Sequence, residues 1–477
     1  MASETTPLID GNTSPKKAGR PPPPYVYAVA GIATINSVNL GFDIGVSSGV
    51  GLLIQEDMHL SNWELGLFMG SIHAMAAVGS MFSHYFCDRL GRCRTFTLSQ
   101  VIFLMGMCLL VTSKGFTQVL ISRVFTGFAI GIAMAIDPLY ISEVAPASHR
   151  GLLTTLSEIA INFGILLGFT ANWVFADLPA GVNWRMMPIC GSFGPSAMII
   201  LSLTVMPESP RWLVAQGRDN EAEGILRDTH HASEDTNILL NGIKHEAEEE
   251  AKFARLGWQP LLQPDAQTRW MMIVGIGVAV AQQITGIESV VMYSPEIFKQ
   301  AGVAKTDADL FAATVCLGIV KTMCIVVSAS FLDNFGRRPL LLLSMAGIAS
   351  CQALMSSGFA TGRQVVVVIG MFGFISFFSF GIGPICWLLA SEVFPTNIRA
   401  KAMSMATTLN RLTSATVALT FLPLSDFLSM PGYFCFFAIL SALAGMIQFF
   451  TVPETKGKTL ESVKESFDAR TFELAQT

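Results

Sequence analysis

The chain has 477 residues, of which 51% are hydrophobic and only 14% are charged, whereas soluble domains carry about 25% charged residues. The formal net charge of −5 at pH 7 provides no basic surface for nucleic acid, so we exclude that class of protein. Apolar stretches of about 20 residues, each long enough to cross a bilayer, recur almost from end to end. These features predict an all-α membrane protein with many spans.

The first 24 residues form a polar segment that ends in the prolines Pro21 to Pro24. Because it lacks the apolar middle and cleavage site of a signal peptide, we expect a cytoplasmic tail, with insertion directed by the first span. The tail contains Glu4-Thr-Thr-Pro-Leu8-Ile9, which fits the acidic dileucine pattern of sorting signals. A pattern this short also arises often by chance, and both interpretations stay open.

Twelve spans follow in chain order. A hydrophilic insert at about 214–265 separates the sixth span from the seventh, and its run Lys244-His245-Glu246-Ala247-Glu248-Glu249-Glu250 predicts a solvated helix. The expected spans are 26–53, 65–87, 96–113, 118–141, 152–175, 185–206, 270–296, 310–332, 338–358, 365–391, 401–425 and 432–452.

The loops between these spans differ in their basic residues, and basic loops face the cytoplasm. One set of loops holds little beyond Lys114, Lys299, Lys305 and Arg363. The rule therefore places both termini and the insert inside the cell, together with the more basic loops, which hold Arg89, Arg92, Arg94, Arg150, Arg337, Arg338, Arg399 and Lys401.

Two charged motifs occur twice, in the same order and after corresponding spans. Glu143-x-x-Pro146-x-x-x-Arg150 returns as Glu392-x-x-Pro395-x-x-x-Arg399, and Asp88-Arg-Leu-Gly-Arg92 returns as Asp333-Asn-Phe-Gly-Arg337. Repeats of this kind indicate two related six-helix halves. The expected organisation is a tail at 1–24, a first half at 25–213, a cytoplasmic helical linker at 214–265, a second half at 266–455 and a cytoplasmic tail at 456–477.

With these motifs the chain resembles the sugar porter family of the major facilitator superfamily, from about Gly41 to Glu461. The motifs that carry the resemblance are Gly41-Phe-Asp-Ile-Gly45, Asp88 to Arg94, Pro207-Glu-Ser-Pro-Arg-Trp212, Gln282-Gln283, Asp333 to Arg338, Gly381-Ile-Gly-Pro384 with Trp387, and Pro453-Glu-Thr-Lys456. Cys93 departs from the family, which usually has adjacent basic residues there. The resemblance implies the major facilitator fold, with twelve transmembrane helices in two pseudo-symmetric halves.

Within the family, the chain looks most like plant-type polyol and monosaccharide transporters. This likeness rests on Glu158-Ile-Ala-Ile-Asn162 through Gly168, on Gly286 to Pro295, and on Asn410-Arg411. It implies symport of a sugar or sugar alcohol with a proton, in the plasma membrane or, if the dileucine pattern acts, a vacuolar or endosomal membrane. A uniporter remains the alternative in the same class. A non-transporting sensor is less favoured, because only a short segment follows Pro453.

A carboxyl group in the first span is the candidate for proton coupling. Asp43 lies between two glycines in the middle of that span, where a charge costs at least about 2.5–3.5 kcal/mol. In the proton symporters that the chain resembles, the matching Asp pairs with an Arg, which here is Arg123. Protonation of Asp43 would release Arg123 and change the helix packing, whereas the alternative is a fixed ion pair that only holds the bundle.

Several polar residues in the spans are candidate contacts for a neutral polyol. The side-chain amides of Gln282 and Gln283 offer donors and acceptors that match adjacent hydroxyls. Trp387 offers an apolar face and an N–H donor, and Asn410 is a further candidate. Each of these residues has core packing as its alternative role.

By resemblance, Glu158, Glu288 and Lys321 face the central cavity, where glucose facilitators have amides at the two Glu positions. Two acids and one base there would form a network in which Lys321 holds one carboxylate ionised; packing is the alternative. Where facilitators have a sugar-binding Glu, this chain has Ser379, which puts that contact in doubt. The role of Asp137 stays open: it either lines the cavity or lies near a solvated end of the span without a function.

The duplicated motifs predict a cytoplasmic gate, in which acids and arginines pair while the protein is open outward and part when it opens inward. The alternative is permanent stapling of the loops. The gate residues are Asp88, Arg92, Glu143, Arg150, Asp333, Arg337, Glu392 and Arg399.

Nothing in the chain indicates an enzyme. It has no phosphate-binding loop of the Walker type and no metal-ligand cluster, and its nine cysteines show no C-x-x-C spacing, so we expect packed thiols. We expect no catalytic residue, metal or cofactor, with H+ as the coupling ion. The expected partners are a small sugar or sugar alcohol and the lipid bilayer, with the monomer as the working unit.

Overall fold

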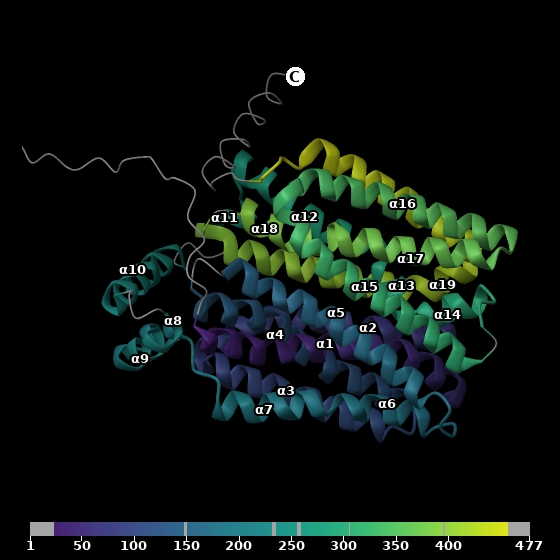
Figure 1. Ribbon diagram of the computed structural model, residues 1–477, viewed down its shortest axis with the longest axis horizontal. Helices are drawn as coiled ribbons and strands as arrows, with labels where there is room; N and C mark the ends of the chain where they lie inside the picture. The colour runs from purple at the N-terminus through teal and green to yellow at the C-terminus, as the bar shows by residue number, and fades with distance from the viewer. Residues whose placement is uncertain are drawn as a thin grey trace, which may run out of the picture.

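The protein, seen here as a computed structural model, is a bundle of long helices that run roughly along one direction (Figure 1). The structure describes residues 23–146, 150–230, 235–254, 259–304, 306–394 and 396–456, apart from some side chains within these ranges. Two groups of helices, one from each half of the chain, lie on opposite sides of the bundle (Figure 1). This arrangement confirms the predicted all-α membrane fold.

The first half contains the helices up to the linker. They are α1 (Pro24–Met58), α2 (Asn62–Leu90), α3 (Arg92–Val111), α4 (Phe116–Val144), α5 (Arg150–Phe175), α6 (Asn183–Gly191) and α7 (Phe193–Thr204). The second half contains α12 (Ala266–Ile284), α13 (Ile287–Met292), α14 (Ser294–Gln300), α15 (Asp307–Phe335), α16 (Arg337–Thr361), α17 (Gln364–Phe380), α18 (Ile382–Val393) and α19 (Thr396–Thr451).

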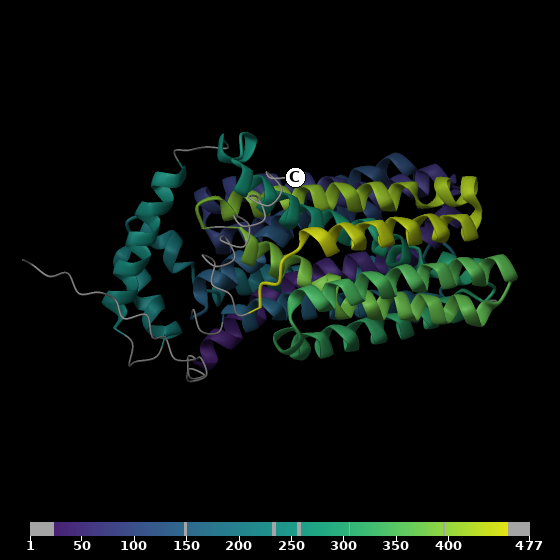
Figure 2. The ribbon, with the colours of Figure 1, turned by 90° about the horizontal axis from the view of Figure 1, so that it is seen from above.

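The last helix, α19, accounts for two of the twelve predicted spans. The described part of the chain has 11 stretches long and apolar enough to cross a membrane, and the last of them, Lys401–Thr451, has 51 residues. At about 1.5 Å per residue it is more than twice as long as a bilayer core. Ser429 has φ 61° and interrupts the helix, and Figure 2 shows α19 running out and returning. The predicted spans 401–425 and 432–452 therefore both exist.

Three predicted spans are broken helices rather than continuous ones. The sixth is interrupted at Ser192, the seventh at Gly286 and Tyr293, and the tenth at Gly381. Gly286 has φ 78°, a conformation that side-chain-bearing residues rarely adopt. Hydropathy does not reveal such breaks, because the apolar composition continues through them.

Helices α1 and α5 approach each other closely through glycines. A Cβ atom on Gly41 would lie 1.9 Å from the Ile161 carbonyl oxygen, and one on Gly45 would lie 2.3 Å from that of Ile165. These two glycines flank Asp43. Because they have no side chain, the Asp43 segment of α1 can pack directly against the backbone of α5.

The outer surface of the bundle is apolar, as expected for contact with lipid. Large side chains such as Phe193 and Phe427 are 75% and 84% exposed. All nine cysteines are free, but the expectation that they are packed holds only in part, since Cys108, Cys190, Cys316 and Cys435 are exposed.

The linker between the halves folds into helices at one end of the bundle (Figures 1 and 2). These helices are α8 (Pro210–Ala215), α9 (Asp219–Thr229), α10 (Thr236–Ala254) and α11 (Gln259–Leu262). A small core of Leu213, Ala222, Leu226 and Leu240 joins α8, α9 and α10. The predicted solvated helix falls within α10. We call this end of the bundle the linker end.

Candidate functional site

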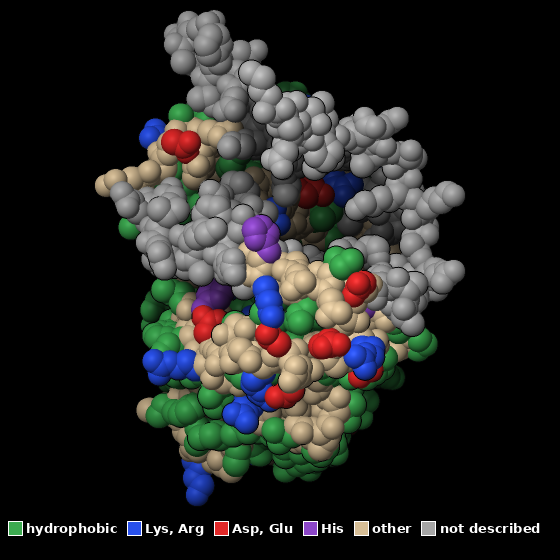
Figure 3. All heavy atoms as spheres, turned by 90° about the vertical axis from the view of Figure 1, so that its left-hand side faces the viewer, with side chains coloured by type: hydrophobic (Ala, Val, Ile, Leu, Met, Phe, Trp, Pro, Cys, Tyr) green, Lys and Arg blue, Asp and Glu red, His purple; other side chains and the backbone are tan. Residues whose placement is uncertain are grey.

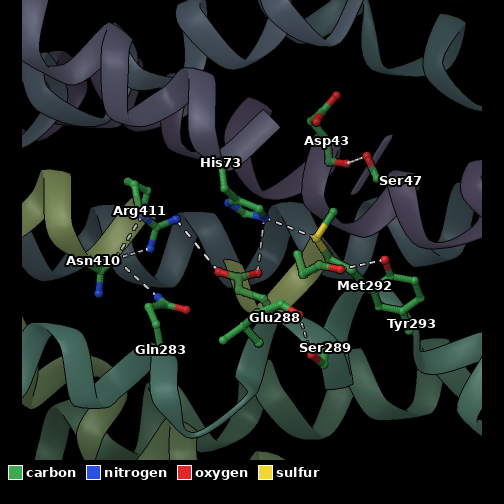
Figure 4. Close-up of polar contacts among 12 residues, drawn as sticks. Asp43, Ser47, His73, Gln283, Glu288, Ser289, Met292, Tyr293, Asn410 and Arg411 are labelled. Carbon is green, nitrogen blue, oxygen red and sulfur yellow. Dashed lines mark hydrogen bonds and ion pairs between the residues drawn. The ribbon is translucent and has the colours of Figure 1, made fainter. Parts of the chain in front are cut away.

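Buried polar residues from both halves meet where the halves face each other, and the predicted Gln283, Glu288 and Asn410 are among them (Figure 4). Three elements of the second half contribute to this group: the end of α12, the short helix α13 and the middle of α19. The break at Gly286 starts a new helix direction and so places Glu288 beside residues of the first half. We call this group of buried polar residues the interface site.

Three amides form the core of the interface site. Asn410 donates from Nδ2 to Gln282 Oε1 at 2.9 Å and accepts at Oδ1 from Gln283 Nε2 at 3.3 Å. Gln282 Nε2 in turn donates to the Gly383 carbonyl at 2.9 Å. Gln283 Oε1 is buried without a hydrogen-bond partner, so the cluster retains one free acceptor.

Glu288 links the amides to the first half. One carboxylate oxygen lies 3.9 Å from Arg411 Nη1 and the other lies 3.7 Å from His73 Nε2, which is also 3.2 Å from Met292 Sδ. Arg411 donates from Nε and Nη2 to Asn410 Oδ1 at 3.0 and 2.6 Å. A continuous polar chain therefore runs from the amides in α12 and α19, through Glu288 in α13, to His73 in α2 (Figure 4).

Lys321 of α15 makes a second link between the halves, because its Nζ donates to Asn162 Oδ1 on α5. Its ammonium group lies within electrostatic range of Glu158 and Glu288, and Glu158 is also within range of Arg411. The predicted trio is thus gathered in one place. Arg411 is a second cation in this group, at 3.9 Å from Glu288.

The other predicted contacts are placed differently. Trp387 of α18 is partly buried and packs against the large apolar core of the bundle. Ser379, at the position where a family contact was in doubt, is buried and its hydroxyl has no hydrogen-bond partner.

The expected pair of Asp43 and Arg123 forms beside the interface site, since Arg123 lies within electrostatic range of His73. Arg123 Nη1 lies 3.4 Å from Asp43 Oδ2, and both residues are only 1% exposed. Arg123 also donates from Nη2 to Ser47 Oγ at 2.8 Å, and its guanidinium stacks 3.9 Å from the Phe68 ring centroid. Arg123 Nε has no partner, so the pair is only partly satisfied.

At the linker end, the first half carries one of the predicted ion pairs. Arg92 donates from Nε and Nη2 to the two oxygens of Glu143 at 2.7 and 2.6 Å. Glu208 lies against the start of α3 and accepts from the backbone N–H groups of Arg92 at 2.8 Å and Cys93 at 3.2 Å. Burial raises the pKa of Glu208, and these hydrogen bonds oppose that rise.

The second half repeats this arrangement. Arg337 Nη2 lies 3.2 Å from Glu392 Oε1, and Glu454 accepts from the backbone N–H groups of Arg337 and Arg338 at the start of α16 at 3.0 and 3.2 Å. Burial acts to raise the pKa of Glu454, but four backbone N–H donors outweigh it and hold that pKa below its usual range. The two halves thus share one scheme, in which a carboxylate caps a helix N-terminus.

Among the side chains that the structure describes, the remaining gate residues show no comparable pairing. The exposed Asp88 uses its backbone carbonyl to accept from Trp212 Nε1 at 3.0 Å, and Arg399 donates from Nε to the Phe394 carbonyl at 2.9 Å while its Nη2 has no partner. The side chains of Arg150 and Asp333 lie outside the described residues, as does the dileucine pattern. Figure 3 shows this end, where acidic and basic side chains lie interspersed on the described surface.

Several residues of these sites were missing from the sequence-based prediction. Arg411 and His73 complete the chain around Glu288, and Asn162 holds Lys321. An ionisable residue within an apolar span is itself a functional signal, and Arg411 and His73 both carry it. Glu208 and Glu454 lie in the quoted motifs, but only the fold shows that they cap α3 and α16.

Comparison with known proteins agrees with this architecture. Residues 29–467 match the family described as "Sugar (and other) transporter". The chain is 38% identical to the probable polyol transporter 4 of Arabidopsis thaliana over 449 residues, which cover 93% of this chain and 85% of that protein. It is 32% identical to the D-xylose transporter of Levilactobacillus brevis, over 91% and 94% of the two chains.

Solved structures resemble the fold over nearly the whole chain. The inward open conformation of the xylose transporter XylE from E. coli superimposes with a TM-score of 0.80 at 26% identity, over 92% of this chain and 99% of that one. The proton:xylose symporter XylE bound to 6-bromo-6-deoxy-D-glucose gives a TM-score of 0.78 at 27% identity, over 93% and 99%. The chain therefore belongs to the sugar transporter family of the major facilitator superfamily.

Proposed function

We propose that this protein is a secondary active transporter that carries a polyol or monosaccharide together with a proton by alternating access. The observation that carries the proposal is the interface site, where amides and charged groups from both halves are buried together. Gln283 Oε1, free of a partner in this site, can accept a hydrogen bond from a solute hydroxyl. A neutral solute with several hydroxyls supplies the matching donors and acceptors.

The proposed binding residues are the amides, the aromatic ring and the charged trio that the sequence indicated. Glu158, Glu288 and Lys321 provide charged hydrogen-bond partners, which bind more strongly than neutral ones. Because these residues come from both halves, solute bound there contacts both, and a rocking motion of the halves exposes it to one side at a time. The full proposed set is Glu158, Gln282, Gln283, Glu288, Lys321, Trp387 and Asn410.

Asp43 and Arg123 are proposed to couple transport to the proton. Proton uptake by Asp43 removes its attraction for Arg123, and Arg123 then has Ser47 as its remaining partner in this group. The relatives support this assignment, since one similar structure is that of a proton:xylose symporter and several relatives are polyol transporters. The proposal requires no cofactor.

The linker end is proposed to face the cytoplasm, with both tails on that side. The gate motifs are proposed to act at this end.

The protein is proposed to work as a monomer, and the plasma membrane is the proposed location. Sorting to an internal membrane through Leu8 and Ile9 is the alternative, and the two are told apart by imaging the parent and a variant carrying Leu8→Ala with Ile9→Ala.

The test is a measurement of solute and proton movement in proteoliposomes that contain the purified protein. Sorbitol, mannitol, inositol, xylose and glucose are added in turn while internal pH is recorded. Acidification of the lumen that accompanies uptake of one of these solutes supports symport. Uptake without a pH change shows a uniporter, and the absence of uptake and exchange for every solute contradicts the proposed substrate class.

A further inference from the structure

Asp137, whose role the sequence left open, lies in the membrane-spanning part of α4. It is 1% exposed and comes directly before Pro138, six residues before the gate residue Glu143. The Ser37 hydroxyl of α1 donates to Asp137 Oδ2. Ser157 of α5 places its hydroxyl near the same carboxyl group. One acidic side chain thus lies at the meeting point of three helices.

This carboxyl group differs from Asp43 in having no cation beside it. Among the described residues, none with a positive charge lies within electrostatic range of it, and the polar groups beside it are the two serine hydroxyls. Asp43, by contrast, has Arg123 at 3.4 Å. An ionised carboxylate buried in hydrocarbon without a cation is costly, and binding a proton removes that cost.

The hydrogen-bond pattern also favours a protonated carboxyl group. Asp137 Oδ1 and Ser157 Oγ are both buried, and both lack a hydrogen-bond partner of good geometry. An ionised carboxylate offers acceptors only, whereas a protonated one has an O–H that can donate. A proton on Oδ1 therefore lets Asp137 donate to Ser157 Oγ while Oδ2 accepts from Ser37, and both unpartnered atoms are then satisfied.

The position of Asp137 relates it to Asp43. Ser37 precedes Asp43 by six residues on α1, a rise of about 9 Å towards the linker end. The buried polar residues Asn36 and Asn39 lie on the same stretch of α1. A polar stretch of α1 therefore leads from the Asp43 pair towards Asp137 and the linker end.

The charged and titratable groups on the surrounding helices are few. On α1 the nearest in sequence to Ser37 is Asp43. On α4 they are Arg123 and Glu143, each already in an ion pair, and Tyr140, whose hydroxyl donates to the Pro207 carbonyl. On α3, Arg92 is paired with Glu143, Cys93 lies against the Pro207 carbonyl and Arg94 is exposed. On α2, which also packs against α4, His73 lies beside Glu288, and His84, Asp88 and Arg89 are exposed. On α5, Glu158 follows Ser157 and is within range of Lys321 and Arg411, and the Arg150 side chain lies outside the described residues.

We propose that Asp137 is a second proton-binding site, which takes up and releases a proton on the linker side of Asp43. Its use in the transport cycle rests on the proposed function, but proton binding itself does not. While protonated, Asp137 joins α1, α4 and α5 through Ser37 and Ser157. Release of the proton to water at the linker end leaves an uncompensated carboxylate that favours separation of these helices.

Infrared difference spectroscopy of the purified full-length protein in lipid tests proton binding directly. We expect the parent at neutral pH to show the C=O stretch of a protonated carboxyl group, identified by its shift in deuterated water. Asp137→Asn should lose this band. Asp43→Asn, which removes the other acid of this region, serves as the matched control and should retain it. A band that persists unchanged in Asp137→Asn overturns the proposal.

Ser157→Ala provides a second variant that keeps the carboxyl group, and it decides the matter if Asp137→Asn fails to fold. Loss of the hydroxyl removes the acceptor for the acid proton, so the C=O band should shift to higher frequency. A band at the parent frequency contradicts the arrangement. If the parent shows the band but no solute drives proton movement, the proposed function fails while the proton site stands.

Discussion

Lys299 of α14 lies 3.0 Å from Glu56 near the end of α1 and so joins the two halves of the protein at the end opposite the linker. Asn62 at the start of α2 adds a second contact there, because its Nδ2 donates to Asp426 Oδ2 of α19 at 2.8 Å. At the linker end, the ion pairs Arg92–Glu143 and Arg337–Glu392 each lie within one half. An ion pair and a hydrogen bond among the described residues thus hold the halves together at the outer end.

Lys299→Gln is expected to weaken this outer contact and to favour the outward-open state. Exposed ion pairs contribute about 0.2–1 kcal/mol, so the ratio of outward-open to inward-open molecules should rise about 1.4- to 5-fold. The measurement is the labelling rate of a single cysteine introduced near the outer end of the interface. Lys114→Gln, an exposed lysine of the first half, is the matched control. The exchanged pair Glu56→Lys with Lys299→Glu should restore the parent rate, and failure to do so argues against the ion pair.

Asp43→Asn is expected to abolish uphill accumulation of solute while leaving exchange intact. The amide keeps the shape of the side chain but cannot bind or release the proton, so the pH gradient no longer drives transport. Accumulation and exchange of labelled solute are measured in proteoliposomes with and without an imposed pH gradient. Asp137→Asn is tested beside it, since both variants remove one buried acid. Concentrative uptake at the parent level by Asp43→Asn would show that its pair with Arg123 is structural.

Glu454→Gln is expected to lower thermal stability in a way that depends on pH. The folded protein holds the pKa of Glu454 below its ordinary value of 4.5, so the ionised group stabilises the fold above that pH. This stabilisation is lost as the pH falls through the folded-state pKa. A charge at a helix N-terminus contributes about 0.3–1 kcal/mol. The melting temperature of the parent should therefore exceed that of the variant near neutral pH and converge with it below 4.5.

Glu208→Gln provides the contrast in the first half. Burial raises the pKa of Glu208 above 4.5, so the parent should lose stability relative to this variant as the pH rises from that value through the raised pKa. The two glutamates cap corresponding helices, and their pH profiles should nevertheless run in opposite directions. If stability changed with pH in the same direction for both glutamates, burial would not distinguish Glu208 from Glu454.

Much of this architecture follows from sequence patterns alone. Apolar length predicted the twelve spans, and the duplicated motifs predicted that Arg92 and Arg337 occupy matching positions. The breaks at Gly286 and Gly381 were not predicted, because hydropathy averages over a window and is insensitive to one residue's conformation. The pairing of Glu288 with Arg411 depends on how α13 turns after Gly286, which is a tertiary feature. A local pattern therefore identified Glu288 and Lys321 but not Arg411.

The charge chain through Glu288 leads to the last prediction, which concerns solute recognition. Arg411→Gln should weaken solute binding, because Glu288 loses its cation and Asn410 Oδ1 loses the two donors that orient it. A hydrogen bond to a charged group contributes about 1.5–3 kcal/mol, so affinity should fall about 10- to 150-fold. Glu288→Asn, which introduces the amide of glucose facilitators, should instead change the preference between linear polyols and ring sugars.

Lys321→Ala distinguishes the role of Lys321 from that of Arg411, the other cation of the site. Lys321 donates to Asn162 and lies within electrostatic range of both carboxylates, so its loss removes a nearby positive charge and should shift the pH dependence of uptake upward. Uptake of sorbitol, mannitol, inositol, xylose and glucose is measured for the parent and the three variants between about pH 5 and 8. Equal losses for every solute, with the parent's pH profile, would show that these charges only hold the halves together, and the binding assignment would then be wrong.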